Sequence, residues 1–332
     1  MTTGRDKIFL GYKAGLLVAA ITLMVAMGLT VELAWRIAPF KTTRILFCSE
    51  LLKLMIAVCF SCTESGETKV SASPFLTVRY WGKKMLFAVP AFLYFLTNNT
   101  AYLAQKYLSV HLVTLMANMK VIIAASFAYS AMGQRFTSMQ IVALCITFLG
   151  LVVLNLNPGQ KHGSTHELTI SKILLTVAYG LVTSTLSSIA GVLCEYLYKR
   201  RPYGRKMSFH RQSVHIYAFG VFFNILGMCL QGSSGISNDG DSETVFFHWS
   251  HALMICLSAS SGILMGAIMK YLDNVVRNLA VCVGTIILTL MSWLMFHNPL
   301  TIQFVVGGTL VLSSVILYRI SSPPEKMQLK EE

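Results

Sequence analysis

Long apolar runs separated by short polar segments follow one another along the chain, from near residue 10 to near residue 319. A helical run of about 20 apolar residues crosses the hydrocarbon core of a bilayer, which is roughly 30 Å thick. The chain is therefore predicted to be an all-α membrane protein with ten transmembrane helices. Their expected bounds are 10–34, 43–62, 84–105, 108–132, 137–156, 170–196, 212–231, 249–270, 276–297 and 300–319.

The loops between these runs are short, and only 63–82 and 232–248 have room for much structure. We therefore expect a single transmembrane domain over 1–332. Ten helices divide into two groups of five, here about 10–156 and 170–319. A duplicated unit with an odd number of helices enters the membrane upside down, so we expect two inverted five-helix repeats, an arrangement that recurs in transporters. Ser138–Val142 and Thr301–Val305, which open the last helix of each half, are similar in sequence.

Composition supports the membrane setting and assigns an orientation. Hydrophobic residues make up 55% of the chain and charged residues only 12%, against roughly 25% charged in soluble domains. With the N-terminus inside, nineteen Lys and Arg residues fall on the cytosolic side and six on the opposite side; Lys53 and Lys120 lie within helices. Both termini are therefore predicted to be cytosolic. The net charge of +13 then reflects topology, and no nucleic acid partner is expected.

The chain lacks the motifs of several other classes. Most of its eight cysteines lie inside apolar runs, and Cys59 and Cys62, three positions apart, have no partner ligands nearby in the sequence. We therefore expect neither a metal nor a cofactor. No HExxH or GxGD motif is present, and His111 and His215 are isolated, so the chain is not expected to be an enzyme. The first apolar run is long enough to span and has no small-residue cleavage site, unlike a secretory signal peptide.

Charged residues at membrane depth point to function, because an ionised side chain there usually faces a cavity or a partner. Lys120 lies in the middle of the 108–132 run, with no acid within four positions. It is a candidate contact for a phosphate or carboxylate; the alternative is an ion pair with an acid elsewhere, such as Glu50 or Glu195. Lys270 ends the 249–270 helix, where it is either a second anion contact, a snorkelling lysine or a partner of Asp273.

Two further charge pairs have helical spacing. Glu50 and Lys53 are three positions apart and share one helix face, so they are expected to neutralise each other as a structural or gating pair. Glu195 and Lys199 are four positions apart and are expected to form a structural pair.

The 84–105 helix carries a polar stripe. Tyr94, Asn98 and Tyr102 recur every four residues, with Asn99 beside them, so helical geometry places the stripe on one inner face. Interhelical hydrogen bonding and binding of a base or sugar are both open. The 170–196 helix has a cluster of small hydroxyl residues that includes Ser187, for which helix packing is the default role.

Several segments together resemble the pyrimidine nucleotide-sugar transporters, the UDP-sugar and CMP-sialic acid carriers of the Golgi. The similarity extends over about 10–320 and includes Ser49–Lys53, Asn98–Asn99, Lys120 and Ala190–Val192 with Glu195. The most specific segment, Lys270–Arg277, is similar to the family's K-Y-x-D-N-I-x-K signature.

The resemblance implies a drug/metabolite-transporter fold that exchanges a cytosolic nucleotide sugar for lumenal nucleoside monophosphate across the Golgi membrane. By position, Lys120 and Lys270 would bind phosphate. The pocket for nucleoside and sugar would be lined by Tyr94, Asn98, Asn99, Ser187, Ser213 and Tyr217.

The chain also departs from the family pattern. It has Thr97 where the family usually has Gln, and Val113 and Thr114 where it usually has Tyr-Gln. Pro90–Leu96 makes it more similar to UDP-sugar-transporter-like members than to the archetypal CMP-sialic acid carriers. These departures leave the base and the sugar of the substrate open. The sequence also leaves open whether copies associate into a homo-oligomer, and whether the membrane is that of the Golgi or of the endoplasmic reticulum. A carrier of another phosphorylated metabolite and a non-transporting membrane scaffold are the alternatives.

Overall fold

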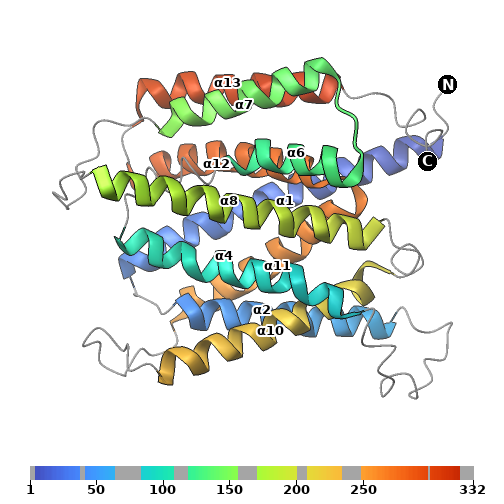
Figure 1. Cartoon of the computed structure of the whole chain (residues 1–332), viewed down its shortest axis with the longest axis vertical. Coiled ribbons are helices and arrows are strands. Elements are labelled where there is room, and N and C mark those ends of the chain that lie inside the picture. The colour runs from blue at the N-terminus through green and yellow to red at the C-terminus, as the bar shows by residue number, and fades with distance from the viewer. Residues whose placement is uncertain are drawn as a thin grey trace. The chain divides into compact units, whose positions relative to one another are not determined.

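The computed structural model describes residues 4–37, 42–63, 84–107, 119–155, 170–199, 208–233, 248–297 and 300–321. Within these ranges the chain forms ten α-helices and one 3₁₀ turn, and no strand (Figure 1). The elements are α1 (Gly4–Ile37), α2 (Thr42–Thr63), η3 (Met85–Phe87), α4 (Ala88–Tyr107), α6 (Lys120–Met132), α7 (Ser138–Asn155), α8 (Ile170–Lys199), α10 (Phe209–Ser233), α11 (Trp249–Tyr271), α12 (Asn274–Phe296) and α13 (Ile302–Ile320).

The hydropathy pattern located these helices well. Most predicted bounds agree with the observed ends to within a few residues, because an apolar run in a bilayer must form a helix to pair its backbone groups. The exception is α6, whose described helix begins only at Lys120. Residues 108–118, including His111, Val113 and Thr114, lie outside the described ranges, as do most of 63–82 and 232–248.

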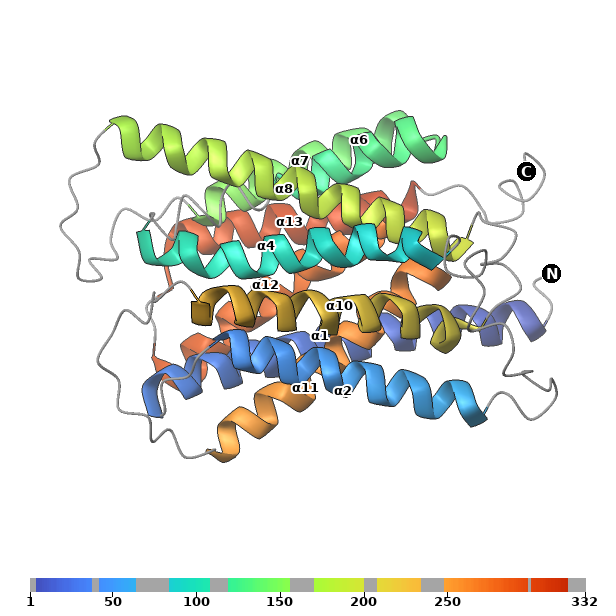
Figure 2. The ribbon, with the colours of Figure 1, turned by 60° about the horizontal axis from the view of Figure 1, so that its bottom comes forward.

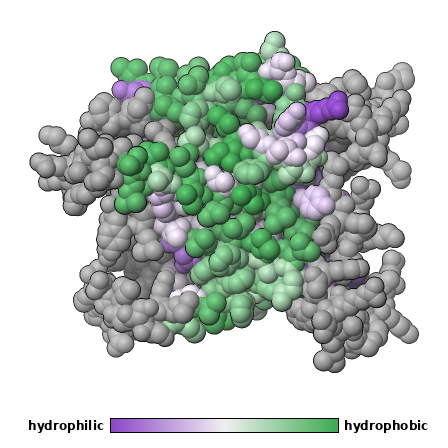
Figure 3. Space-filling model, in the orientation of Figure 1, coloured by the Kyte–Doolittle hydropathy of each residue, from purple (hydrophilic) through white to green (hydrophobic). Residues whose placement is uncertain are grey.

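The described helices are suited to lipid. Seven of them are long and apolar enough to cross a membrane, while α6 and most of α7 form shorter apolar helices. Large apolar side chains are widely exposed, up to 81% for Ile302 and 77% for Ile320. Green, apolar residues dominate the described surface in Figure 3. Such exposure would be unfavourable in water but is not in a hydrocarbon environment.

The helices group into two compact units. The first comprises 1–102 and 189–284, and the second 103–188 and 285–332. Each unit takes segments from both predicted halves, 10–156 and 170–319, so the division into compact units differs from the predicted division into repeats. The repeats themselves stay a prediction.

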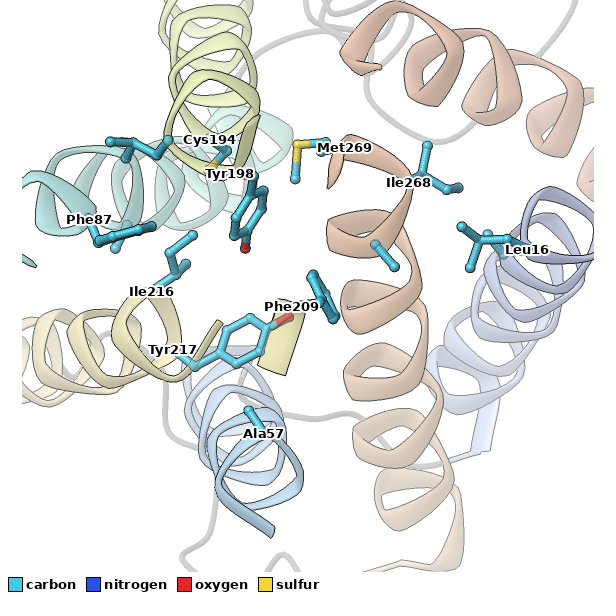
Figure 4. Packing of buried hydrophobic residues seen from close by; sticks show 14 residues of the cluster. Leu16, Ala57, Phe87, Cys194, Tyr198, Phe209, Ile216, Tyr217, Ile268 and Met269 are labelled. Carbon is cyan, nitrogen blue, oxygen red and sulfur yellow. The ribbon is translucent and has the colours of Figure 1, made fainter. Parts of the chain in front are cut away.

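In the first unit, α2 packs along α10 and α11, and α1 packs against α11 (Figure 2). Its core joins α8, α10 and α11. Figure 4 shows Tyr198 of α8, Ile216 and Tyr217 of α10, and Met269 of α11 converging there. All four side chains are less than a tenth exposed.

In the second unit, α7 and α13 form the most extensive helix pair (Figure 1). Gly150 and Gly307 face each other so closely that a Cβ on Gly150 would lie 2.9 Å from the Gly307 carbonyl oxygen. The Thr147 and Ser314 hydroxyls share a buried 2.7 Å hydrogen bond. Small residues and interhelical hydroxyl bonds are the usual means of helix association in membranes. The order of these contacts shows that the two helices are antiparallel.

Candidate functional site

A cavity of about 190 Å³ lies within the first unit, among helices α2, α4, α8, α10, α11 and α12. Its charged lining residues are Glu50, Lys53 and Arg277. The uncharged polar ones are Tyr94, Asn98, Asn99, Tyr198, Tyr217 and Asn224. Apolar residues from the same helices, among them Leu46, Phe95 and Ile216, complete the walls.

Arg277, one turn into α12, supplies a cation to this cavity. Its guanidinium donates to the Tyr94 hydroxyl at 3.0 Å, contacts the Met269 sulfur at 3.4 Å and reaches the Asn278 amide oxygen at 3.5 Å. All three partners are neutral. Within the described residues no carboxylate forms an ion pair with Arg277, so its charge is available to an anion.

Glu50 and Lys53 bring the other two charges. Lys53 Nζ lies 2.5 Å from Glu50 Oε1 and 5.2 Å from the centre of the Tyr217 ring. Two glycines make room for the pair: a Cβ on Gly220 would be 3.0 Å from the Glu50 carboxylate, and one on Gly262 would be 3.1 Å from the Lys53 stem. The predicted pairing is confirmed, and the pair lies in the cavity wall.

The segment Lys270–Arg277 is a break between two helices. α11 ends at Tyr271, Leu272 has non-helical torsions, and the Asp273 carboxylate accepts from the Val276 backbone N–H at 2.6 Å to cap α12. A helix break exposes backbone groups that need partners inside a membrane. Lys270 lies before the break, on α11, and Arg277 lies after it, on α12. The two side chains therefore point in different directions.

Glu195 and Lys199 of α8 supply those partners. Glu195, which is 0% exposed, accepts from the Asn274 backbone N–H at 2.8 Å and from Lys199 Nζ at 2.8 Å. Lys199 Nζ also donates to the Leu272 carbonyl. We call these four residues the junction clamp. The predicted Glu195–Lys199 pair is confirmed, and its structural role is to hold the α11–α12 break.

The structure places the sequence-predicted site residues in four settings. Tyr94, Asn98, Asn99 and Tyr217 line the cavity. Ser213 is fully buried beside the phenols of Tyr198 and Tyr217, behind the lining.

Lys270 does not line the cavity; its ammonium donates to Gln212 Oε1 at 3.3 Å. Lys120 and Ser187 belong to the second unit, where the Lys120 backbone carbonyl accepts from the Ser188 hydroxyl at 3.2 Å. Their roles as substrate contacts stay predictions. His215, which is isolated in the sequence, is half-buried with its ring 5.9 Å from that of Phe87. The side chain of Tyr102 lies outside what the structure describes.

Three polar lining residues, Tyr198, Asn224 and Arg277, were not singled out from the sequence. Arg277 is the last residue of the Lys270–Arg277 signature, and Asn224 is an asparagine two turns after Tyr217 within an apolar run. A polar residue at membrane depth is the signal that could have marked Asn224. No group of three His, Cys, Asp or Glu side chains able to hold a metal ion occurs in the part of the chain that the structure describes.

Comparison with known proteins assigns the family. Residues 11–319 match the model of a family described as "Nucleotide-sugar transporter". The chain belongs to the nucleotide-sugar transporter family. With its apolar helices, it is therefore a multi-pass membrane protein of a family that transports nucleotide sugars.

Individual relatives are distant. CMP-sialic acid transporter 3 of Oryza sativa subsp. indica is 28% identical over 288 residues, which is 84% of this chain and 69% of that protein. CMP-sialic acid transporter 3 of Arabidopsis thaliana is 27% identical over 300 residues, 88% of this chain and 71% of that protein. A solved crystal structure superposes with a TM-score of 0.66 at 10% identity, covering 94% of this chain and 99% of the other. That likeness concerns the fold alone.

Proposed function

We propose that this transporter carries a pyrimidine nucleotide sugar from the cytosol into the Golgi lumen in exchange for nucleoside monophosphate. The observation that carries the proposal is the cavity of the first unit, where Arg277 has only neutral partners among amide and phenol groups. Glu50 and Lys53 cancel each other, so the described lining has a net charge of one positive unit. A phosphate group satisfies that charge, while amides and aromatic rings suit a nucleoside and a sugar.

In this proposal Arg277 binds phosphate. A guanidinium offers several donors in a planar fork that matches phosphate oxygens, and the Tyr94 hydroxyl holds it in place at 3.0 Å. Lys120 and Lys270 remain further phosphate candidates by their place in the family pattern. Asn98, Asn99 and Tyr217 contact the nucleoside and sugar, and Ser213 is kept as a candidate for the same pocket. Ser187 is kept as a substrate-binding candidate by its place in the family pattern.

The proposed substrate is a UDP-sugar, on the similarity of Pro90–Leu96 to UDP-sugar-transporter-like members. The names of the plant relatives favour CMP-sialic acid as the alternative. We place the protein in the Golgi membrane with both termini cytosolic, and the two five-helix halves alternate access to the central site by rocking.

The test is uptake of labelled UDP-sugars and CMP-sialic acid into proteoliposomes preloaded with UMP or CMP. Arg277→Ala is expected to lower uptake at least tenfold, since hydrogen bonds to charged groups are worth about 1.5–3 kcal/mol. Arg277→Lys keeps the charge but loses the fork, so it should retain part of the activity. Lys120→Ala and Lys270→Ala, in the same assay, show whether either lysine also binds substrate.

Arg135→Ala is the matched control, because Arg135 is an exposed arginine between α6 and α7 that does not line the cavity. It should transport normally. Normal uptake by a folded Arg277→Ala protein would contradict the proposed phosphate site. If the protein takes up phosphorylated sugars that lack a nucleoside, and not nucleotide sugars, its substrate is a different phosphorylated metabolite. If it shows neither uptake nor nucleotide-induced thermal stabilisation, a scaffold role is favoured.

A further inference from the structure

Asn224 of α10 has a buried amide oxygen with no partner among the residues that the structure describes. The side chain is 5% exposed and lines the cavity of the first unit. Its Nδ2 donates to the Gly220 carbonyl, one turn earlier, at 2.8 Å. The Oδ1 atom makes no hydrogen bond within the described part of the chain. Buried polar side chains are nearly always paired in folded proteins, so an unpaired one in a cavity wall points to a missing ligand.

The orientation of this amide follows from its own helix. The Gly220 carbonyl can only accept a hydrogen bond, so it selects the NH₂ end of the Asn224 amide. The oxygen is thereby turned away from the helix backbone. Asn224 presents an acceptor to the cavity, and its partner must be a donor.

An aromatic ring lines the same cavity and packs on α10 close to Asn224 in the sequence. The Phe95 ring packs on α10 at Gly227, within one turn of Asn224; a Cβ on Gly227 would be 2.7 Å from the ring. Phe95 itself lines the cavity, together with the apolar side chains of Leu46 and Ile216. A flat ring with polar N–H groups at its edge fits such walls, because the face can stack on an aromatic side chain while the edge forms hydrogen bonds.

We infer that Asn224 is a specificity-determining residue, whose Oδ1 accepts a hydrogen bond from an N–H group on the edge of the substrate's nucleobase. This inference rests on the proposed nucleotide-sugar transport and deepens it by assigning one contact. In a uracil the donor is the ring N3–H, and in a cytosine it is the exocyclic amine. The phosphate is bound separately, at Arg277.

The experiment pairs a change in the protein with the matching change in the ligand. Binding of UMP and CMP to the purified transporter is measured by calorimetry, and the tighter of the two is kept. Asn224→Leu, which preserves volume but removes the acceptor, should bind it about tenfold more weakly. The methylated ligand, N3-methyl-UMP or N4,N4-dimethyl-CMP, should bind the unaltered protein about tenfold more weakly, yet lose nothing further on Asn224→Leu.

Two more variants separate binding from folding. Asn224→Ser keeps a bond to the Gly220 carbonyl, since a serine hydroxyl can donate one turn back along a helix. The shorter side chain withdraws the acceptor from the cavity. Like Asn224→Leu, this variant should no longer discriminate between the methylated and the unmethylated base. Thr30→Val is the matched control: Thr30 is 7% exposed, its hydroxyl donates to the Ala26 carbonyl at 2.8 Å, and it does not line the cavity. It should bind both ligands as the unaltered protein does.

The outcomes are distinct. An equal penalty for the methylated base on the unaltered protein and on both Asn224 variants overturns the inference and leaves the proposed function standing. If Asn224→Leu weakens binding of the nucleotide sugar but not of UMP or CMP, the inference is also overturned, because Asn224 would then contact the sugar. The proposed function would still stand. If the unaltered protein binds neither UMP nor CMP, the proposed function fails, and the Asn224 contact with it.

Discussion

At the scale of single residues, the cavity is organised by three charges. Arg277 has neutral partners, whereas Lys53 is neutralised by Glu50 at 2.5 Å and lies over the Tyr217 ring. The side chains of Lys53 and Glu50 are 12% and 16% exposed, so solvent screens them little and each charge acts strongly on its neighbours. In the proposed site, the pair therefore sets the net charge that a nucleotide would meet.

Removing either member of the pair should change nucleotide affinity in opposite directions. Lys53→Met leaves an unpaired carboxylate in the wall, which repels phosphate; UMP or CMP should bind at least tenfold more weakly. Glu50→Gln leaves an unpaired ammonium, and binding should tighten severalfold. Both effects are measured by calorimetry on purified protein.

The double variant Glu50→Gln/Lys53→Met restores the net charge and should bind close to the unaltered protein. A purely structural pair would behave differently: both single variants would weaken binding or lower the thermal midpoint together. If both single variants change nucleotide affinity in the same direction, the pair does not control the charge of the site.

The residues of the site were predictable to different degrees. Tyr94 and Asn98 follow helical spacing from the sequence alone, and both line the cavity. Lys270 and Arg277 are seven residues apart in one signature, but only Arg277 lines the cavity. Their difference arises from the non-helical Leu272, whose torsions redirect the chain. Asn224 could have been marked as a polar residue at membrane depth, but its unpaired oxygen could not be predicted, because which amide atom stays unpaired depends on the bond to the Gly220 carbonyl.

At the scale of elements, hydropathy predicted the helices well, since lipid requires each spanning segment to satisfy its own backbone hydrogen bonds. It could not predict how helices join. The α11–α12 break depends on Glu195 and Lys199, about 75 residues earlier in the chain. The sequence indicated that these two residues pair with each other, but their hold on a distant backbone follows only from the tertiary structure.

The junction clamp should make a large contribution to stability. Glu195 is fully buried, and removing one member of a buried ion pair typically costs about 3–5 kcal/mol because the other charge is left without compensation. Lys199→Ala should therefore lower the thermal midpoint of the empty transporter markedly. The measurement is thermal unfolding in detergent, without nucleotide.

The double variant Glu195→Gln/Lys199→Met provides the comparison. It removes both charges, and the amide oxygen of the introduced glutamine can still accept from the Asn274 backbone N–H. It should be more stable than Lys199→Ala, although one fewer native residue remains. If Lys199→Ala unfolds at the midpoint of the unaltered protein, the clamp contributes nothing to stability.

At the scale of the whole molecule, the charge of the cavity affects whether inward transport of one nucleotide is coupled to outward transport of another. In the proposed alternating-access cycle, an empty carrier has to close over Arg277 without an anion, and an uncompensated charge inside the membrane is costly. A bound nucleotide removes that cost in both directions. We therefore expect exchange to be much faster than net transport.

Counterflow measures this directly. Vesicles preloaded with UMP or CMP should accumulate labelled nucleotide sugar at least tenfold faster than empty vesicles. Equal rates in both preparations would show that the empty carrier reorients freely, and transport would then be uniport rather than exchange.

The makeup of the first unit has a consequence for biosynthesis. Its cavity takes walls from α2 and α4 near the beginning of the chain and from α12, whose Arg277 is made last among them. Helices enter the membrane in order of translation, so α4 is in lipid before Arg277, the hydrogen-bond partner of Tyr94, has been made. Contacts between segments so distant in sequence form slowly. The interval before residue 277 leaves the ribosome is thus when this protein is most exposed to misassembly and to quality control.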